Sequence, residues 1–196
     1  NYMAEGCCRA DRLEDIRGGL SGLGIEAVGR LEEMGMFVDI SHLNDDGIKD
    51  VIRVAKKPLV ATHSNARSVN RNYRNLTDDQ IRALAAAGGV MGLNANRSIV
   101  GVGADDGRPI RKMCDHVESV IDLVGPDHIG YGLDLCDSYD SAQPRLEFEL
   151  QRGDCLRDPS ELVDVTAELL RRGMDNGTAV KVIGGNFLRY FRSVLP

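Results

Sequence analysis

The chain has 196 residues, of which 42% are hydrophobic and 28% are charged, so it carries enough apolar material for one ordinary globular core. No run approaches the roughly 20 apolar residues of a membrane-spanning helix. The formal net charge is −6 with both signs interspersed, which argues against a nucleic-acid partner. Five cysteines without a C-x-x-C pair indicate neither a disulfide framework nor a thiolate zinc site, so a reducing, cytoplasmic location is expected.

Short apolar runs alternate with amphipathic helical patterns, as in consecutive βα units. A helix is expected first, at about residues 24–35. The four strand-like runs that follow cover residues 36–41, 58–62, 90–94 and 129–133. Helices are expected after them, capped by Asn44 or Asp45, opened by Thr77 in a capping box, starting near Pro109 and starting at Asp158–Pro159. A last helical segment covers about 176–194, interrupted at Gly184 and Gly185.

The spacing of these runs predicts a parallel sheet. Strand starts near residues 37, 59, 90 and 129 are 22, 31 and 39 residues apart, which is long enough for a helical crossover each time. A four-stranded parallel sheet fits either an open doubly wound domain or half of an eight-stranded (βα) barrel. Periodicity alone leaves both possibilities open.

Two histidines follow the first two strand runs at matching positions, His42 after residues 36–41 and His63 after residues 58–62. If these strands are parallel neighbours, both imidazoles lie at the carboxyl-end rim, where α/β folds place their active sites. Neutral imidazole binds zinc, and a catalytic zinc usually has three protein ligands. The pair therefore indicates a shared metal ion as readily as two separate polar contacts.

Asp134 closes the fourth run at the same rim. It is a candidate metal ligand, general base or anchor for an ammonium group, and equally a routine turn residue. Asp137 and Asp140 are weaker candidates. His116, inside an amphipathic helix, and His128, at the amino end of a strand, are expected to be structural.

An arginine-rich loop follows His63 and is close enough to present a guanidinium group to a substrate carboxylate. Its arginines are Arg67, Arg71 and Arg74. The glycine-rich strings at 101–106 and 130–132 do not form a nucleotide-binding fingerprint.

Four strings, taken together, resemble the membrane (renal-type) dipeptidase family of zinc peptidases. They are residues 35–42 (GMFVDISH), 62–67 (THSNAR), 73–76 (YRNL) and 184–189 (GGNFLR). Residues 5–7, 19–24 and 115–117 add further matches, so the similarity runs almost end to end. The order and spacing also agree with the family: 21 positions separate His42 from His63, and 11 separate His63 from Arg74.

The resemblance implies an α/β fold, a (βα)8 TIM-type barrel of the metal-dependent hydrolase kind, with two zinc ions bridged by a Glu and a hydroxide. Carried over residue by residue, it implies that His42 and His63 bind the second zinc. Arg74 would hold the substrate carboxylate, and catalytic Asp134 would handle the amino end or shuttle a proton. The implied reaction is hydrolysis of a dipeptide by a metal-activated hydroxide. After Asp134 the family commonly continues F-D-G, where this chain has residues 135–137 (LCD).

The family's H-x-D zinc pair, its bridging Glu and a further substrate-binding His lie upstream of the segment matched by Asn1. Residues 1–196 are therefore expected to form a single segment that supplies roughly the last four βα units, the carboxyl-terminal half of the barrel. This chain alone is expected to bind at most one zinc and to be inactive. Its expected partners are a dipeptide substrate, the missing amino-terminal half or a second chain, and, as an open alternative, further copies of itself in a homo-oligomer. No nucleic-acid partner and no transmembrane segment in this chain are expected.

Two other functions stay open. One is a noncatalytic half-barrel that lacks the first metal site and serves as an assembly or binding module. The other keeps the barrel and the metal but acts on another amide, such as a cyclic imide or lactam, which has no free carboxylate for Arg74 to bind.

Overall fold

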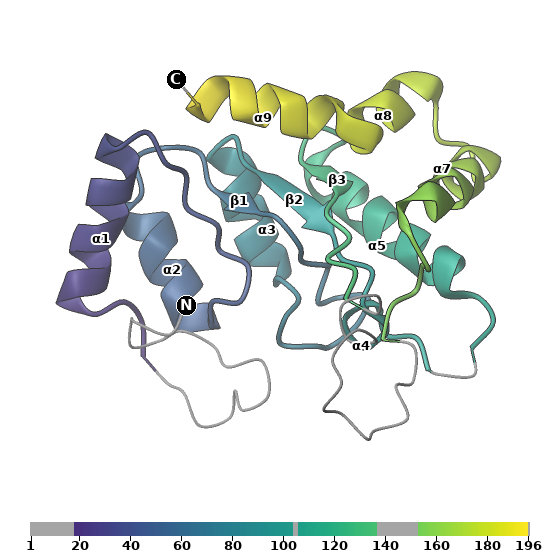
Figure 1. Cartoon of the computed structure of the whole chain (residues 1–196), viewed down its shortest axis with the longest axis horizontal. Helices are drawn as coiled ribbons and strands as arrows, with labels where there is room; N and C mark the ends of the chain where they lie inside the picture. The colour runs from purple at the N-terminus through teal and green to yellow at the C-terminus, as the bar shows by residue number, and fades with distance from the viewer. Residues whose placement is uncertain (1–17, 104–105, 137–152, 196) are drawn as a thin grey trace.

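The computed structural model describes residues 18–103, 106–136 and 153–195 (Figure 1). The strands are β1 (Val60–Ala61), β2 (Val90–Leu93) and β3 (Ile129–Tyr131). The helices are α1 (Gly22–Glu33), α2 (Asp45–Val54), α3 (Asp78–Ala86), α4 (Arg97–Val100), α5 (Pro109–Val124), α7 (Leu162–Arg171), α8 (Asn176–Val180) and α9 (Asn186–Val194), with helical turns η2 (Pro159–Glu161) and η3 (Lys181–Gly185). The family match at residues 5–7 and the candidates Asp137 and Asp140 lie outside the described residues.

The predicted parallel sheet is confirmed for three strands, in the order β1-β2-β3. Val60 pairs with Val90, and Met91 pairs with Ile129, so the register brings the carboxyl ends of all three strands to one edge. Every residue of β1 and β2 is buried. That is the pattern of a parallel sheet, whose strands read as short continuous apolar runs.

The first run, residues 36–41, is in the expected place but is not a regular strand. It contributes one isolated parallel bridge, Asp39 with Val60, in which the Ile40 N–H donates to the Val60 carbonyl at 2.8 Å. The side chain of Asp39 accepts hydrogen bonds from the backbone N–H groups of Ser41 and Thr62. Because a carboxylate then occupies donors that a ladder would use, regular pairing stops after one bridge.

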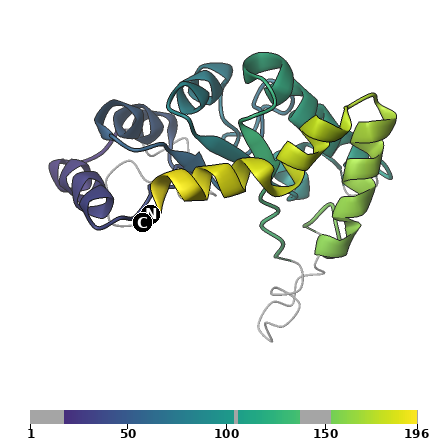
Figure 2. The same cartoon turned by 90° about the horizontal axis from the view of Figure 1, so that it is seen from above.

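Helices cover one face of the sheet. Helices α2, α3 and α5 lie in a row on that face, with α1 beside α2 (Figure 2). Helix α9 crosses the amino ends of the strands, where Tyr190 packs with Val60 and Val90 in a second, smaller apolar cluster. The other face of the sheet is contacted by α9 and η3, and a Cβ atom at Gly130 would meet the Phe187 ring. None of the described helices is long and apolar enough to cross a membrane.

The predicted helix ends are largely confirmed. Asn44 caps α2, and Thr77 with Gln80 forms the capping box of α3. Helix α5 begins at Pro109 and ends where Gly125 adopts φ +85°. The expected interruption of the last helix appears as the π-helical turn η3, so residues 176–194 stay helical throughout.

His116 on α5 joins three elements beneath the loop that carries His63. Its Nδ1 accepts from the Ala66 N–H at 3.2 Å, and its Nε2 lies 3.0 Å from the Val100 carbonyl. The side chain therefore carries its proton on Nε2 and is fully buried. Burial, with a smaller contribution from Lys112, lowers the pKa of His116 from 6.5 to about 4.

We expect this histidine to make folding stability depend on pH. Its folded pKa is depressed, so the stabilisation is complete above pH 6.5 and is lost as the pH falls towards about 4. Between about pH 7.5 and about pH 5 the loss is on the order of 2 kcal/mol. Urea unfolding of the wild type and of His116→Gln at both pH values checks this: the variant should be less stable at neutral pH and show a shallower pH dependence. The same change in the free energy of unfolding between the two pH values for both proteins would contradict this expectation.

Candidate metal centre

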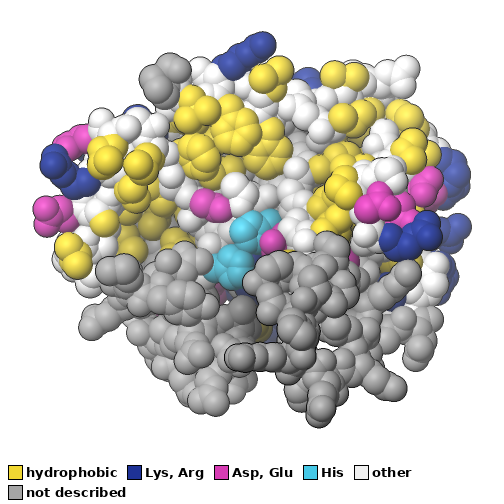
Figure 3. All heavy atoms as spheres, viewed as in Figure 1, with side chains coloured by type: hydrophobic (Ala, Val, Ile, Leu, Met, Phe, Trp, Pro, Cys, Tyr) yellow, Lys and Arg dark blue, Asp and Glu magenta, His cyan; other side chains and the backbone are white. Residues whose placement is uncertain are grey.

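Three side chains converge at the carboxyl edge of the sheet. They are His42, after the bridged segment, His63, two residues after β1, and Asp134, three residues after β3. Their ligand atoms all lie within 4.8 Å of one another. The two imidazole centroids are 4.9 Å apart, and His63 Nε2 is 3.9 Å from Asp134 Oδ2. Figure 3 shows the imidazoles side by side, with an acidic side chain next to them, on the face that the view presents.

Asp134 reaches His63 although β2 lies between their strands. Parallel neighbours are about 4.8 Å apart, so the first and third strands are separated by about twice that distance. The chain closes this gap because it turns inward after β1, which sets the Thr62 carbonyl against Gly92 of β2 and Gly132 after β3. A Cβ atom at either glycine would collide with that carbonyl oxygen. Two glycines therefore make room for the turn that carries His63 towards Asp134.

Two residues of the cluster have strained backbones. Among the described residues, His42 (φ 71°) and Asp134 (φ 54°) are the non-glycine residues with positive φ. The left-handed conformation costs an L-residue about 1–2 kcal/mol. Such outliers persist where the surrounding structure holds them, and they gather at functional sites.

The local environment keeps both imidazoles neutral near pH 7. Burial, Arg74 and His63 together lower the pKa of His42 from 6.5 to about 4. Burial likewise lowers the pKa of His63. His63 Nε2 is a buried atom without a hydrogen-bond partner in the structure. A neutral imidazole whose buried nitrogen lacks a protein partner suits a metal ion, so the donor set fits one.

Asp134 is oriented by a pair of buried asparagines that the sequence reasoning missed. Asn94 Nδ2 donates to Asp134 Oδ2 at 3.2 Å. The Asn65 carboxamide in turn bonds both the N–H and the carbonyl of Asn94, at 3.0 and 3.1 Å. Asn94 is the polar residue at the end of the third strand run. The criterion that selected His42, His63 and Asp134, a polar residue at the carboxyl end of a strand run, therefore also selects Asn94.

Among the three arginines of the loop, the structure brings Arg74 to the cluster. It is buried, and its Nη2 donates to the His63 carbonyl at 3.4 Å. Arg67 instead forms a two-pronged ion pair with Asp45, with both contacts at 2.8 Å, and ties the loop to α2. Its role in the described structure is therefore to hold the loop.

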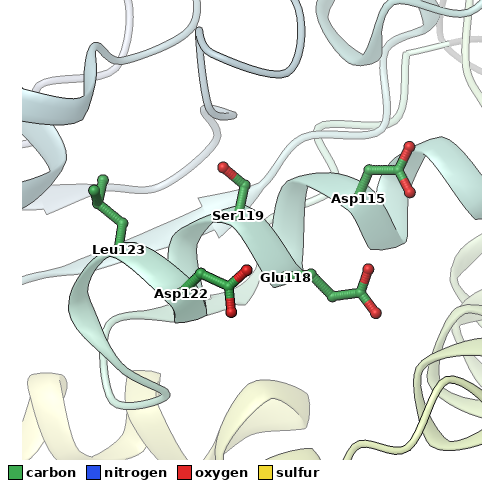
Figure 4. Close-up of a pocket in the computed structure, with 5 residues that line it drawn as sticks. All are labelled: Asp115, Glu118, Ser119, Asp122 and Leu123. Atoms are coloured by element: carbon green, nitrogen blue, oxygen red, sulfur yellow. The ribbon is translucent and has the colours of Figure 1, made fainter.

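A second acidic group lies on the outer surface of α5 (Figure 4). Asp115 and Glu118 both contact Arg172 Nη1, at 2.8 and 2.7 Å, and Glu168 pairs with the same guanidinium. These ion pairs join α5 to the end of α7. The group is explained by this tie between helices.

A parallel α/β sheet with two histidines and an aspartate gathered at its carboxyl edge defines an α/β protein with a candidate metal site. Its sequence matches the pattern of the membrane dipeptidase family, Peptidase family M19, over residues 1–195. The chain belongs to that family, as the resemblance predicted, and the family implies a metal ion at this centre.

Curated relatives agree with this assignment. The chain is 33% identical over 179 residues to dipeptidase verJ of Clonostachys rogersoniana, covering 91% of this chain and 42% of that protein. It is 30% identical over 176 residues to dipeptidase 3 of Mus musculus, covering 90% and 33%. The chain thus spans less than half the length of these two relatives.

A solved structure of a metallopeptidase from Rhodobacter sphaeroides, liganded with a phosphinate mimic of the dipeptide L-Ala-D-Ala, is 30% identical and superposes with a TM-score of 0.74. The match covers 92% of this chain and 48% of that one. An amidohydrolase from Pseudomonas aeruginosa is 28% identical with a TM-score of 0.80, covering 100% of this chain and 62% of that one.

Gly132→Ala tests the inward turn after β1. We expect the added methyl group to displace Thr62 and with it His63, which lowers both stability, by about 1–3 kcal/mol, and zinc affinity. Urea unfolding and zinc competition with a chromophoric chelator measure the two effects. Gly184→Ala is the matched control, because a Cβ there meets nothing within 4 Å. Unchanged zinc affinity in a folded Gly132→Ala protein would contradict this account of the turn.

Proposed function

We propose that this chain supplies the carboxyl-terminal half of a (βα)8 barrel whose complete form is a zinc-dependent dipeptidase. The observation that carries the proposal is the convergence of His42, His63 and Asp134 at one strand edge, with His63 Nε2 buried and without a protein partner. The family assignment supports it, and so do relatives and a solved structure that are named as dipeptidases or metallopeptidases.

Each residue of the centre has a distinct role in this proposal. His42 and His63 hold the ion as neutral ligands. Zinc held by these residues would supply Lewis-acid chemistry, lowering the pKa of water towards neutral and polarising the scissile carbonyl. Asp134, held by Asn94, handles the substrate ammonium group or moves a proton to the leaving amine. Arg74 presents its guanidinium to the substrate carboxylate.

The half-barrel part of the proposal rests on exposed apolar side chains and on the share of a solved relative that the chain matches. Apolar side chains gather in patches on the face of the molecule that Figure 3 presents, and Met36, Ile183 and Leu188 are among the exposed large apolar residues. Exposed apolar patches of this kind mark surfaces that another element covers. The chain matches 48% of the Rhodobacter structure, so in this proposal the rest of the barrel is supplied by further residues that cover such patches.

Metal content of the isolated 196-residue chain tests the ligand assignment. We expect at most one zinc per chain, bound weakly because only His42 and His63 supply ligands, and no hydrolysis of dipeptides. His42→Ala and His63→Ala should each abolish the binding. His128→Ala should retain it, because His128 lies at the amino end of β3, opposite the carboxyl edge, and bonds the Gly89 carbonyl there. Equilibrium dialysis with elemental analysis gives the stoichiometry. Two tightly held zinc ions, normal turnover, or binding that survives both histidine variants would refute the proposal.

A second candidate, an amidase acting on a substrate without a free carboxylate, gains support from the similarity to the Pseudomonas amidohydrolase. The role of Arg74 separates it from the dipeptidase. In a preparation that includes the first half of the barrel, Arg74→Met should raise KM for dipeptides at least tenfold, because a bidentate charge pair is lost. A dipeptide amide, which lacks the carboxylate, should be affected much less. If both substrates respond equally, Arg74 does not read the carboxylate.

A further inference from the structure

The inner ring nitrogen of His63 begins a chain of hydrogen bonds that ends at Asp39. Nδ1 of His63 lies 2.7 Å from the hydroxyl oxygen of Thr62. The same hydroxyl donates to Oδ2 of Asp39. These hydrogen bonds thus connect Asp39, in the segment bridged to β1, with the imidazole ring of His63, a candidate metal ligand.

The Asp39 carboxylate is itself held in place. Its Oδ1 accepts from the backbone N–H of Ser41 at 2.9 Å and from that of Thr62 at 3.1 Å. The hydroxyl of Ser41 accepts from the N–H of His63 at 3.1 Å. These contacts fix which oxygen of Asp39 faces Thr62.

The direction of the hydrogen bonds determines where the His63 proton lies. A carboxylate only accepts, so the single hydroxyl proton of Thr62 goes to Asp39. The oxygen of Thr62 then has only lone pairs to offer His63, and Nδ1 must donate. The neutral ring therefore carries its proton on Nδ1, which leaves Nε2 with a free lone pair.

This lone pair lies on the side of the ring that the metal centre needs. Nε2 is buried, has no hydrogen-bond partner and is 3.9 Å from Asp134 Oδ2. The opposite tautomer would place a buried N–H group at this nitrogen and block ligation. Metal-ligating histidines commonly owe their tautomer to such an outer partner.

We propose that Asp39, acting through Thr62, is a positioning residue that holds His63 in the Nδ1–H tautomer and so presents the Nε2 lone pair to the metal centre. The inference rests on the proposed function for its purpose, but the tautomer is a property of the metal-free chain. It can therefore be tested separately.

Asp39→Asn should invert the tautomer. Two backbone N–H groups face the Oδ1 position, so the carboxamide oxygen takes that position and its NH2 group faces Thr62. The Thr62 hydroxyl then accepts from Asn, and its released proton is free to go to His63 Nδ1. The ring proton consequently moves to Nε2, which removes the ligand lone pair.

The first measurement is a two-bond ¹⁵N–¹H correlation spectrum of the metal-free 196-residue chain near pH 7.5, with the His63 signals assigned by their loss in His63→Gln. We expect a protonated Nδ1 and an unprotonated Nε2 in the wild type and in Thr62→Ser, which keeps the hydroxyl. Asp39→Asn should show the reverse. Thr62→Val, which leaves Nδ1 without an acceptor, should lose the Nδ1–H preference.

The second measurement is zinc affinity by chelator competition. Thr62→Val and Asp39→Asn should each weaken binding about 10–100-fold, the usual effect of removing an outer-shell partner. Thr62→Ser should bind as the wild type does. Thr166→Val is the matched control, because it deletes a hydroxyl on α7 that bonds the Tyr131 hydroxyl of β3 and lies outside the centre. Urea unfolding of every variant shows which of them fold.

A wild-type ring protonated on Nε2 overturns the inference outright, whether or not any variant folds. So does a folded Asp39→Asn that keeps the Nδ1–H form, or a folded Thr62→Val with unchanged zinc affinity. If the wild type has the expected tautomer but His42→Ala and His63→Ala both leave zinc binding unchanged, the hydrogen-bond chain from Asp39 to His63 stands and the proposed function fails.

Discussion

The geometry of the centre depends on one close contact, that of the Thr62 carbonyl against Gly92 and Gly132. In a flat parallel sheet, residues after the first and third strands are too far apart to share an ion. Side chains at the two glycine positions would keep the chain after β1 outside the sheet edge. Their absence lets it turn inward, and His63 then faces Asp134 across β2. The site is therefore a consequence of backbone packing before it is one of side-chain chemistry.

The same turn explains why so many polar groups are buried nearby. A chain that leaves the ladder early exposes backbone donors and acceptors that must be satisfied elsewhere. Asp39 accepts two of these N–H groups, and Asn65 bonds both backbone groups of Asn94. The side chains that satisfy the backbone also orient the candidate ligands, Asp39 through Thr62 and Asn94 directly. Structural and functional constraints fall on the same residues.

Local pattern was sufficient for much of the fold. Periodicity and crossover length predicted three parallel strands, and cap residues such as Thr77 and Pro109 marked their helices. The first run was misjudged as a strand because its apolar pattern gives no sign that the Asp39 carboxylate will compete for ladder donors. Asn65 and Asn94 were missed because their roles depend on pairing between segments 29 positions apart. The convergence of His42, His63 and Asp134 was expected because each follows a strand run. That criterion does not explain how His63 and Asp134 come close together, since β2 lies between their strands.

The centre is costly to maintain in the absence of an ion. His42 and Asp134 both hold left-handed backbones, and His63 leaves a buried nitrogen without a partner. Each feature opposes folding by about 1–3 kcal/mol, and a fold under no other demand would relax them. An ion that binds only the folded chain offsets these terms through its own binding free energy. In the proposed function only two imidazoles hold the ion, so the offset is small for this chain by itself. In the complete barrel that we propose, further ligands would strengthen the binding, and completion of the barrel and stable metal binding would be thermodynamically coupled.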